Sequence, residues 1–432
     1  MKPKVLVATT FCWYPTARLA MALSNAGFTV DIVCPRRHPV SKTKVARKIH
    51  RFNGLAPLRS LSAAITDAEP DLIVSGDDLA TRHLHQLYER ERQNGKESPI
   101  CALIERSLGA EESFPISYAR AAFMEMAELE GIRVPKTGVI GNRDDLKGWI
   151  IRNGFPAVLK ANGTSGGVGV RVVRTVDEAD RAFRLLQAPP PFLRAAKHAL
   201  LDDDLTLISP TLRREKFVVN AQAFVDGREA TSAVACWNGR VLAALHFEVI
   251  RKTSPTGHAT VVRSIENPEM AATAEKIVRR LRLSGVHGFD FMLEEQTGNA
   301  YLIEINPRAT QVGHLALGLG RDIPAALYAA VSGDAVQPAQ KVTEKETIAL
   351  FPQEWIRDSE SPLLQSAYHD VPWEEPELVQ DCVNNRRKQS TWYSRAQRKQ
   401  ACSAVASPNR VSAPVKSASS QSPAVGTELG SR

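Results

Sequence analysis

The stretch FPAVLKANGTSGGVGVRVV, residues 155–173, constrains the fold more than any other part of the sequence. Its apolar ends predict two short strands, and the first strand delivers Lys160 into a loop that contains four glycines. Glycines let backbone N–H groups approach phosphate oxygens, and a lysine ammonium adds a point charge. The segment therefore predicts a phosphate-binding strand–loop–strand. It is not a Walker loop, because the lysine precedes the glycines; a mobile turn is the alternative interpretation of the glycines alone.

A second pattern follows in GFDFML, residues 288–293, and YLIEINPR, residues 301–308. Glu304 and Asn306 are two apart on a predicted strand, so their side chains share one face. A hairpin around Gly298 brings Asp290 alongside them. Two carboxylates and an amide oxygen suit Mg²⁺, which also takes phosphate oxygens and water. A polar face turned to water is the alternative, but the flanking apolar runs make unpaired burial costly and favour the metal interpretation.

In this order along the chain, the two patterns resemble the ATP-grasp superfamily over roughly residues 117–333. The resemblance implies that ATP and Mg²⁺ (or Mn²⁺) are cofactors, that Lys160 contacts the α- and β-phosphates, and that Arg308 faces the transferred phosphoryl group. Arg120 would be a second basic phosphate contact, at a position where many members have lysine. The residues implied to cover the phosphates are Gly163, Thr164, Ser165, Gly166, Gly167 and Gly169, and those implied to bind the metal are Asp290, Glu304 and Asn306.

The strand predicted over residues 217–224 leads into VDGRE, residues 225–229, which is similar to the adenine hinge of that superfamily. The resemblance implies that the backbone of Gln222 and Val225 binds the adenine edge and that Glu229 binds the ribose. A plain hairpin with Asp-Gly as its turn is the alternative.

Five further basic or histidine residues near these patterns stay open. Each of the three cations is either a γ-phosphate contact or a solvated strand residue, whereas a structural role is favoured over a substrate contact for the histidines. The residues are Arg251, Lys252, Arg263, His287 and His314.

The N-terminal hundred residues predict an open parallel α/β lobe, similar to the preATP-grasp domain that accompanies the superfamily. The first turn after a strand, residues 9–15, holds no glycine, which excludes a dinucleotide-binding fingerprint. Sheets of this kind bind ligands where strands end, so Thr9, Thr10, Phe11 and Trp13, and likewise residues 75–78, are candidate substrate contacts. Ordinary turn chemistry is the alternative.

The fold class expected is therefore α/β, with an α+β ATP-grasp part whose two subdomains sandwich the nucleotide. We expect an α/β lobe over residues 1–112 and an ATP-grasp domain over 113–338. The latter divides into a small subdomain (about 113–187), an insertion (about 188–212) with a solvated acidic triplet, and a large subdomain (about 213–338). A C-terminal extension covers 339–402. A disordered tail covers 403–432, where Ser, Ala, Pro and Val dominate.

The distribution of charge, apolar residues and cysteines limits the classes of partner and the compartment that we expect. Residues from Asp381 onward carry nine Lys or Arg and two Asp or Glu, so +7 of the net charge of +8 lies there. The body is therefore not basic, and we expect no nucleic-acid partner. The basic and aromatic residues around Trp392 are interpreted as a short amphipathic helix on the enzyme, with a nucleic-acid contact as the alternative. No run of about 18 apolar residues occurs, so no membrane partner is expected. The six cysteines have no CxxC spacing, which fits free thiols in the cytoplasm.

The resemblance implies a carboxylate–amine ligase that uses Mg-ATP to activate a small-molecule carboxylate as an acyl phosphate. An amine then takes the acyl group, and ADP and phosphate are released. Two alternatives stay open: a regulatory module that binds ATP, and a phosphotransferase that stops at phosphorylation. No residue set indicates the acid or the amine, and a homodimer is left open.

Overall fold

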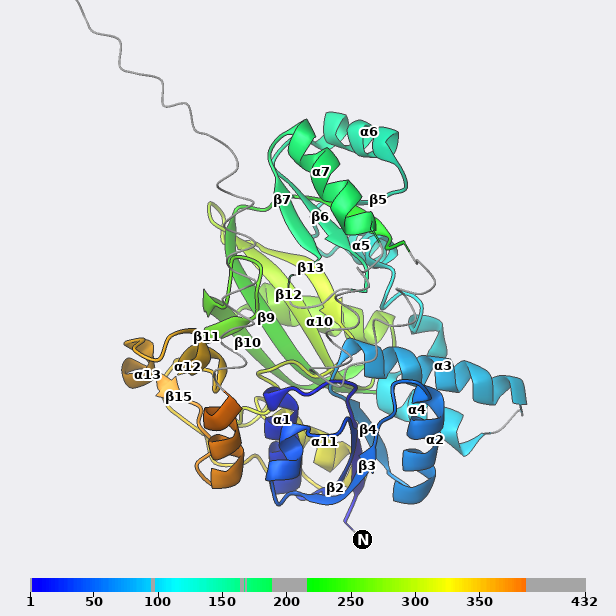
Figure 1. The fold of residues 1–432 in the computed structure, drawn as a ribbon, viewed down its shortest axis with the longest axis vertical. Coiled ribbons are helices and arrows are strands. Elements are labelled where there is room, and N and C mark those ends of the chain that lie inside the picture. The colour runs from blue at the N-terminus through cyan, green and yellow to red at the C-terminus, as the bar shows by residue number, and fades with distance from the viewer. Residues whose placement is uncertain (1, 95–97, 164–166, 168, 189–215, 386–432) are drawn as a thin grey trace, which may run out of the picture.

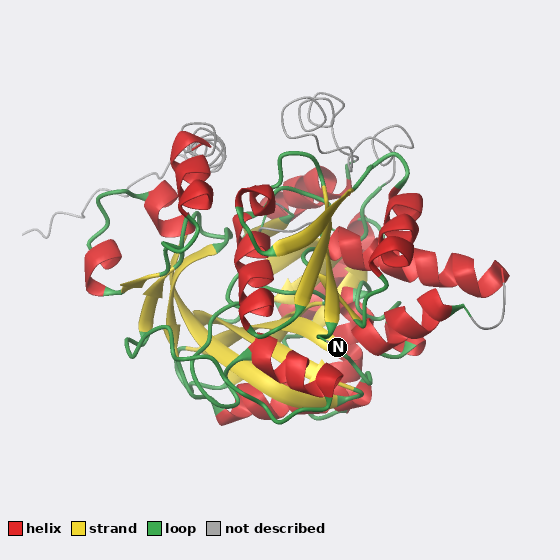
Figure 2. Ribbon diagram, turned by 90° about the horizontal axis from the view of Figure 1, so that it is seen from below, coloured by secondary structure: helices red, strands yellow, loops and turns green. Residues whose placement is uncertain are grey.

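The computed structural model describes residues 2–94, 98–163, 167, 169–188 and 216–385, which form three sheets with flanking helices (Figures 1 and 2). The N-terminal sheet has the order β3-β2-β1-β4 and every pairing in it is parallel. Its inner strand β1 is buried because helices cover both faces of the sheet. The predicted open parallel lobe is confirmed. Its elements are β1 (Lys4–Ala8), α1 (Tyr14–Asn25), β2 (Thr29–Cys34), β3 (Ala46–Arg51), α2 (Pro57–Ala68), β4 (Leu72–Ser75), α3 (Asp78–Asn94) and α4 (Pro99–Leu108).

A second, antiparallel sheet of order β5-β8-β6-β7 lies at the far end of the molecule from the N-terminal lobe (Figure 1). In it β6 and β7 pair with Leu159 opposite Arg171, which confirms the predicted strand–loop–strand. Helix α7 buries an apolar stripe that includes Phe183 and Leu186 against this sheet. The elements are α5 (Arg120–Leu129), β5 (Thr137–Ile140), α6 (Arg143–Asn153), β6 (Ala157–Ala161), β7 (Val170–Val173), α7 (Val176–Gln187) and β8 (Val219–Ala223).

The third sheet has seven strands in the order β13-β12-β9-β10-β11-β14-β15. Alternate residues of β9 face opposite sides: Val234 packs in the cluster that contains α10, and Ala233 packs in the cluster that contains α11. The two helices therefore cover opposite faces of one sheet. The elements are β9 (Gly227–Trp237), β10 (Arg240–Lys252), β11 (Ala259–Ser264), α10 (Pro268–Arg280), β12 (Gly285–Glu294), β13 (Ala300–Asn306) and α11 (Ile323–Ser332).

Residues 339–385, which the sequence assigns to a separate extension, add the last two strands of this sheet. β14 (Thr347–Ala349) pairs with β11, and β15 (Tyr368–His369) pairs with β14. Short helices α12 (Gln353–Arg357) and α13 (Leu363–Ser366) flank these strands. The insertion with its acidic triplet, the basic segment around Trp392 and the tail lie outside the described residues, apart from Ala188 at the start of the insertion.

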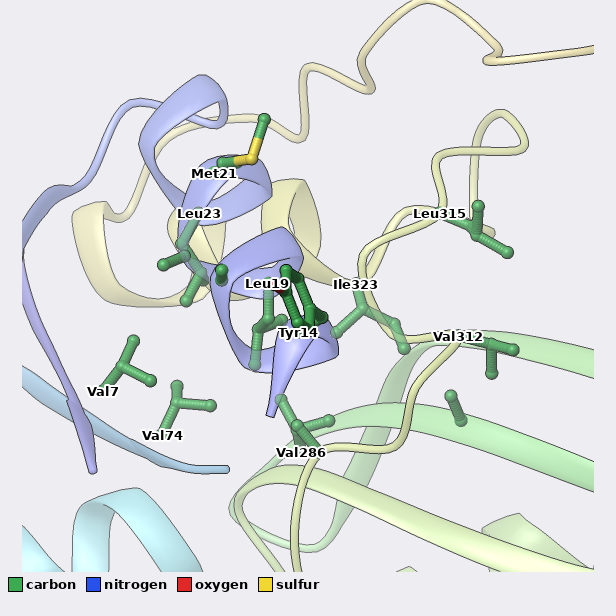
Figure 3. Close-up of a cluster of buried hydrophobic side chains, with 14 of the residues drawn as sticks. Val7, Tyr14, Leu19, Met21, Leu23, Val74, Val286, Val312, Leu315 and Ile323 are labelled. Atoms are coloured by element: carbon green, nitrogen blue, oxygen red, sulfur yellow. The ribbon is translucent and has the colours of Figure 1, made fainter. Parts of the chain in front are cut away.

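One apolar core joins the N-terminal lobe to the large sheet (Figure 3). Leu19 and Leu23 of α1 lie in the same buried cluster as Val286 of β12 and Ile323 of α11. The contact is close at Gly27, where a Cβ would come within 2.9 Å of the Tyr328 ring. The lobe and the large sheet are therefore packed as one body, which fixes the turns after β1 and β4 relative to β12 and β13.

A buried ionic cluster ties the C-terminal part to the same lobe. Asp370, almost fully buried, accepts hydrogen bonds from Arg18 Nη2 of α1 at 2.5 Å and from His314 Nε2 at 2.7 Å. Burial alone would raise the pKa of Asp370, but Arg18 and His314 outweigh it and hold that pKa below its ordinary value. Tyr14 adds a hydrogen bond to Asp381 at 2.8 Å.

Among the described cysteines, Cys34, Cys101 and Cys236 are free thiols, in agreement with the prediction. Among the described helices, none combines the length and the apolar character that crossing a bilayer requires.

We expect Asp370→Asn to lower the free energy of unfolding by about 3–5 kcal/mol at neutral pH, because Arg18 loses its buried counter-charge. Since the pKa of Asp370 is depressed in the folded state, its contribution is complete above the ordinary value of 3.8 and declines at lower pH. Urea unfolding from pH 7 to pH 3 should show the difference from wild type narrowing below about pH 4. Asp334→Asn, at an exposed carboxylate, is the control; equal losses in both variants would contradict the cluster's role.

Candidate functional site

Lys160 links the small sheet to the large one. It stands near the end of β6, and its Nζ lies 3.5 Å from the carbonyl oxygen of Ile303 in β13. The residue is 5% exposed. Burial, with the Arg120 guanidinium nearby, lowers the pKa of Lys160 to about 8. Lys160, which is predicted to contact phosphates, is thus held beside β13, the strand that is predicted to carry metal ligands.

The three predicted metal ligands come together on the β12–β13 pair. Asp290 stands opposite Glu304, and Gly288 opposite Asn306. Asn306 Nδ2 donates to Asp290 Oδ2 at 2.8 Å, and the Thr231 hydroxyl donates to Asp290 Oδ1 at 2.8 Å. Burial, and then the neighbouring Glu304 carboxylate, raise the pKa of Asp290. Two carboxylates that disfavour each other's charge suit a divalent cation between them.

This donor set fits Mg²⁺ bound together with a nucleotide. Carboxylate and amide oxygens are hard ligands, and Mg²⁺ takes its remaining ligands from phosphates and water. The described residues contain no cluster of three or more His, Cys, Asp or Glu that could hold a metal ion without such help. A metal at this place would rest on Asp290, Glu304, Asn306 and the oxygens of a bound phosphate chain.

Two arginines flank the carboxylates. Arg120, the first residue of α5, donates from Nη2 to Glu304 Oε1 at 2.8 Å. Burial would raise the pKa of Glu304, but Arg120 outweighs it and lowers that pKa. Arg308 donates from Nε to Asp78 Oδ2 at 3.1 Å, so it joins the metal residues to the N-terminal lobe.

The turn after β1 contributes an aromatic wall beside Arg308. The Arg308 guanidinium lies 5.8 Å from the centre of the Trp13 ring, and the rings of Trp13 and His258 are 6.1 Å apart. Burial, followed by the charge of Arg308, lowers the pKa of His258 to about 4, so this imidazole is neutral at physiological pH. The buried carboxylate of Asp77 fixes the turn by accepting hydrogen bonds from the hydroxyls of Thr9 and Thr10. Phe11 is adjacent to Trp13.

The predicted adenine hinge crosses between two sheets. β8 pairs with β5 and β6 in the small sheet, whereas β9 pairs with β10 and β12 in the large one. The plain-hairpin alternative is therefore wrong, and Val225 lies on the crossing segment. Gln222, on β8, turns its side chain to Thr137. Glu229, on β9, accepts from Lys252 Nζ at 2.5 Å.

The glycine loop is in tight contact with the turn between β10 and β11. Gly163 and Gly167 both have φ of +72°, in the left-handed region that favours glycine. A Cβ at Gly167 would lie 1.5 Å from the Thr256 carbonyl oxygen, and the Thr256 hydroxyl donates to the Gly167 carbonyl at 3.2 Å. Gly169 accepts from the Ala161 N–H. Thr164, Ser165 and Gly166 lie outside the described residues.

The structure shows the surroundings of the five basic and histidine residues that the sequence left open. Lys252 pairs with Glu229, Arg263 pairs with Glu248 at 2.5 Å, and Arg251 is exposed. His287 bonds the Ser284 carbonyl, and His314 bonds Asp370, both inside the fold. Sequence reasoning missed two residues at the site, Thr231 and Arg82. Arg82 lies one helical turn after Asp78 on a polar helix whose sequence gives no local sign of its role.

Residues 206–312 match the family model of an ATP-grasp domain. The structure is similar to the biotin carboxylase domain of Hydrogenobacter thermophilus 2-oxoglutarate carboxylase, solved as a dimer with MgADP, ADP and bicarbonate. The TM-score is 0.55 at 16% identity, over 79% of this chain and 72% of that one.

It is also similar to N5-carboxyaminoimidazole synthetase from Staphylococcus aureus complexed with ADP, with a TM-score of 0.55 at 14% identity, over 78% of this chain and 80% of that one. A carboxyaminoimidazole ribonucleotide synthase from Aspergillus clavatus, complexed with ATP, has a TM-score of 0.54 at 14% identity, over 78% of each chain. The search of curated proteins gives no match. The fold class and the resemblance to the ATP-grasp superfamily are confirmed.

We expect Gly167→Ala to weaken Mg-ATP binding at least tenfold, because a Cβ cannot coexist with the Thr256 carbonyl and the loop must move. Gly154→Ala is the matched control: Gly154 has a similar φ of +75° but nothing within 4 Å of its Cβ position. Isothermal titration calorimetry on both variants separates close contact from backbone strain. Equal affinities in the two variants would show that the contact with Thr256 does not matter for nucleotide binding.

Proposed function

Because the chain carries an ATP-grasp domain, we propose that it is a Mg-ATP-dependent ligase that activates a carboxylate and joins it to an amine. The observation that carries the proposal is the meeting of two sheets at one point. Lys160 from the small sheet reaches the backbone of β13, the strand whose side chains Glu304 and Asn306 stand beside Asp290. A phosphate cation and a hard-ligand set at one place are what transfer of a phosphoryl group from ATP requires.

The nucleotide would bind between the two sheets. Its adenine would lie at the crossing segment, with the backbone of Gln222 and Val225, and its ribose beside Glu229. Its phosphates would lie at Lys160 and Arg120, under the segment that begins at Gly163. The structural neighbours include proteins solved with ADP and with ATP, which supports a nucleotide site of this kind.

The first chemical step would transfer the γ-phosphoryl group to an oxygen of the acid. The bond between the γ-phosphorus and the bridging oxygen breaks, its electron pair goes to ADP, and an acyl phosphate forms. Lys160 and Arg308 would stabilise the charge that develops on the phosphoryl oxygens. Mg²⁺ bound at Asp290, Glu304 and Asn306 would neutralise phosphate charge.

In the second step the amine nitrogen attacks the acyl carbon, phosphate leaves with the electrons of the C–O bond, and the nitrogen loses a proton. We place the acid and the amine beside Arg308, between the metal residues and the N-terminal lobe. Arg308 supplies a cation there, Trp13 an apolar wall and His258 a neutral imidazole. Asp78 orients the Arg308 guanidinium.

We also propose a compartment and an oligomeric state for the protein. Free thiols at Cys34, Cys101 and Cys236 support a reducing compartment, the cytoplasm. A homodimer is supported by the dimer of the Hydrogenobacter domain.

We expect Glu304→Gln to lower turnover of ATP at least a hundredfold while the protein still folds. The amide keeps a hydrogen-bond acceptor for Arg120 but removes the charge that a divalent cation needs. The control is Glu266→Gln, at an exposed carboxylate outside the site. Wild-type turnover in Glu304→Gln, over a range of Mg²⁺ concentrations, would show that Glu304 is not a metal ligand.

Product analysis tests the reaction itself. Purified protein with Mg-ATP is screened against amino acids, small carboxylic acids and dipeptides, alone and in pairs, and ADP, phosphate and new products are measured. We expect ADP and phosphate to form together with an amide. A stable phosphorylated acid as final product would instead indicate a phosphotransferase, and nucleotide binding without turnover on any pair would indicate a regulatory module.

A further inference from the structure

One face of α3 lines the site from the N-terminal lobe. Asp78, Arg82 and His85 are spaced i, i+4 and i+7, which places them on the same side of the helix. Asp78 binds Arg308, as described above. His85 stacks on Phe114 with 3.7 Å between ring centres, and its Nδ1 lies 3.1 Å from the Tyr118 hydroxyl. Arg82 lies between Asp78 and His85 on this side of α3.

The Arg82 guanidinium lies between the segment that leads to Arg120 and the start of the glycine loop. Its central carbon is 5.1 Å from the centre of the Tyr118 ring, two residues before Arg120. Its Nη2 is 3.4 Å from the position that a Cβ on Gly163 would take. Arg82 is therefore beside the loop predicted to cover the phosphates, although it belongs to a different lobe.

Arg82 differs from the other two arginines of the site in its partners. Arg120 is paired with Glu304, and Arg308 with Asp78. Within the described part of the chain, Arg82 forms no salt bridge, and its guanidinium lies over the face of the Tyr118 ring. A guanidinium has five N–H donors, and a ring face occupies none of them in a linear hydrogen bond. Its donors are therefore available to an anion.

The charges at the site are compatible with an added anion. The described charged groups at its centre are the cations Lys160, Arg120 and Arg308 and the carboxylates Asp290, Glu304, Asp78 and Asp77, the last two of which act on Arg308. Arg82 adds a positive charge that forms no salt bridge with a described carboxylate. A bound nucleotide would bring more negative charge than a single Mg²⁺ removes, so an additional arginine beside the phosphate loop has a ligand to serve.

We propose that Arg82 is a catalytic residue that donates hydrogen bonds to the oxygens of the phosphoryl group being transferred. The proposal rests on the proposed function. The guanidinium keeps its protons throughout: the phosphoryl group passes from the bridging oxygen of ATP to the carboxylate oxygen, and the electron pair of the broken bond stays with ADP. The N-terminal lobe thereby contributes to phosphoryl transfer itself, in addition to lining the space for the acid and the amine.

A positioning role would be the simpler explanation, and it predicts different behaviour. The Tyr118 hydroxyl is already held by His85, so Tyr118 does not depend on Arg82 alone for its place. If Arg82 only supported Tyr118 and the start of the loop, its loss would weaken binding of ADP and of triphosphates alike. If it contacts the transferred group, only ligands that carry a third phosphoryl position should be affected.

The test uses nucleotides and needs no knowledge of the acid. Affinities of the full-length protein for Mg-ADP, for Mg-AMP-PNP, and for Mg-ADP with aluminium fluoride as a mimic of the transferred phosphoryl group are measured by calorimetry. The variants are Arg82→Met, which keeps an apolar stem near Tyr118, and Arg82→Lys, which keeps the charge. Arg90→Met is the matched control, because Arg90 lies two turns further along α3 and pairs with Glu91.

In Arg82→Met we expect the affinity for Mg-AMP-PNP and for the aluminium fluoride complex to fall about ten- to a hundredfold, while that for Mg-ADP stays within twofold. Arg82→Lys should fall between Arg82→Met and wild type, and Arg90→Met should match wild type. Equal losses for all three ligands, or none, would overturn the proposal and leave the proposed function standing. Failure of the wild-type protein to bind any Mg-nucleotide would instead sink the proposed function, and this inference with it.

Discussion

The pairing of Asp290 with Glu304 across β12 and β13 is the constraint on which the rest of the site depends. The hairpin around them is apolar: Phe289, Phe291 and Leu302 are all fully buried. Two carboxylates in such a hairpin raise each other's pKa unless cations surround them. Lys160, Arg120 and Arg308 provide those cations, and each comes from a different part of the chain. The charge requirement of one hairpin therefore fixes where the small sheet and α5 must meet it, and Asp78 of the N-terminal lobe orients Arg308, which follows β13 directly.

Packing elsewhere holds these contributors in register. The lobe cannot shift along the large sheet, because α1 shares a core with α11 and β12, and Gly27 touches Tyr328. The C-terminal residues add a second attachment, since Asp370 joins Arg18 of the lobe to His314 just after β13. The small sheet is connected to the large one through the crossing segment at Val225, between β8 and β9.

The sequence predicted the parts of the fold whose patterns are local. Apolar runs such as those of β1, β2 and β12 mark buried strands, and the two-residue spacing of Glu304 and Asn306 places them on one face whatever surrounds them. β3, with the sequence ARKIHR, was not predicted because its charged side chains hide the strand pattern; they are tolerated since the strand lies at the sheet edge. α3 was missed for a similar reason, as its second half, YERERQN, has hardly any apolar stripe.

Other features depend on partners distant in sequence. Residues 217–229 form a crossing between sheets and not a hairpin, because β8 pairs with β5 and β6 whereas β9 pairs with β12. These partner strands are distant in the sequence. The three-residue β14 is a strand only because β11 offers it an edge. Arg82 is of the same kind: an arginine in a polar helix has no local signal of a role, and its meaning comes from Gly163 and Tyr118.

The contacts at Gly163 and Gly167 bear on how such a site would protect its intermediate. Gly163 meets Arg82 of the N-terminal lobe, and Gly167 meets Thr256 of the turn between β10 and β11. An acyl phosphate hydrolyses readily, so a ligase has to keep water from it until the amine attacks. The same turn carries Lys252 at Glu229 and His258 at Trp13, so the proposed ribose, phosphate and acceptor regions all contact one short segment. Residues 252–258 therefore connect the three proposed regions.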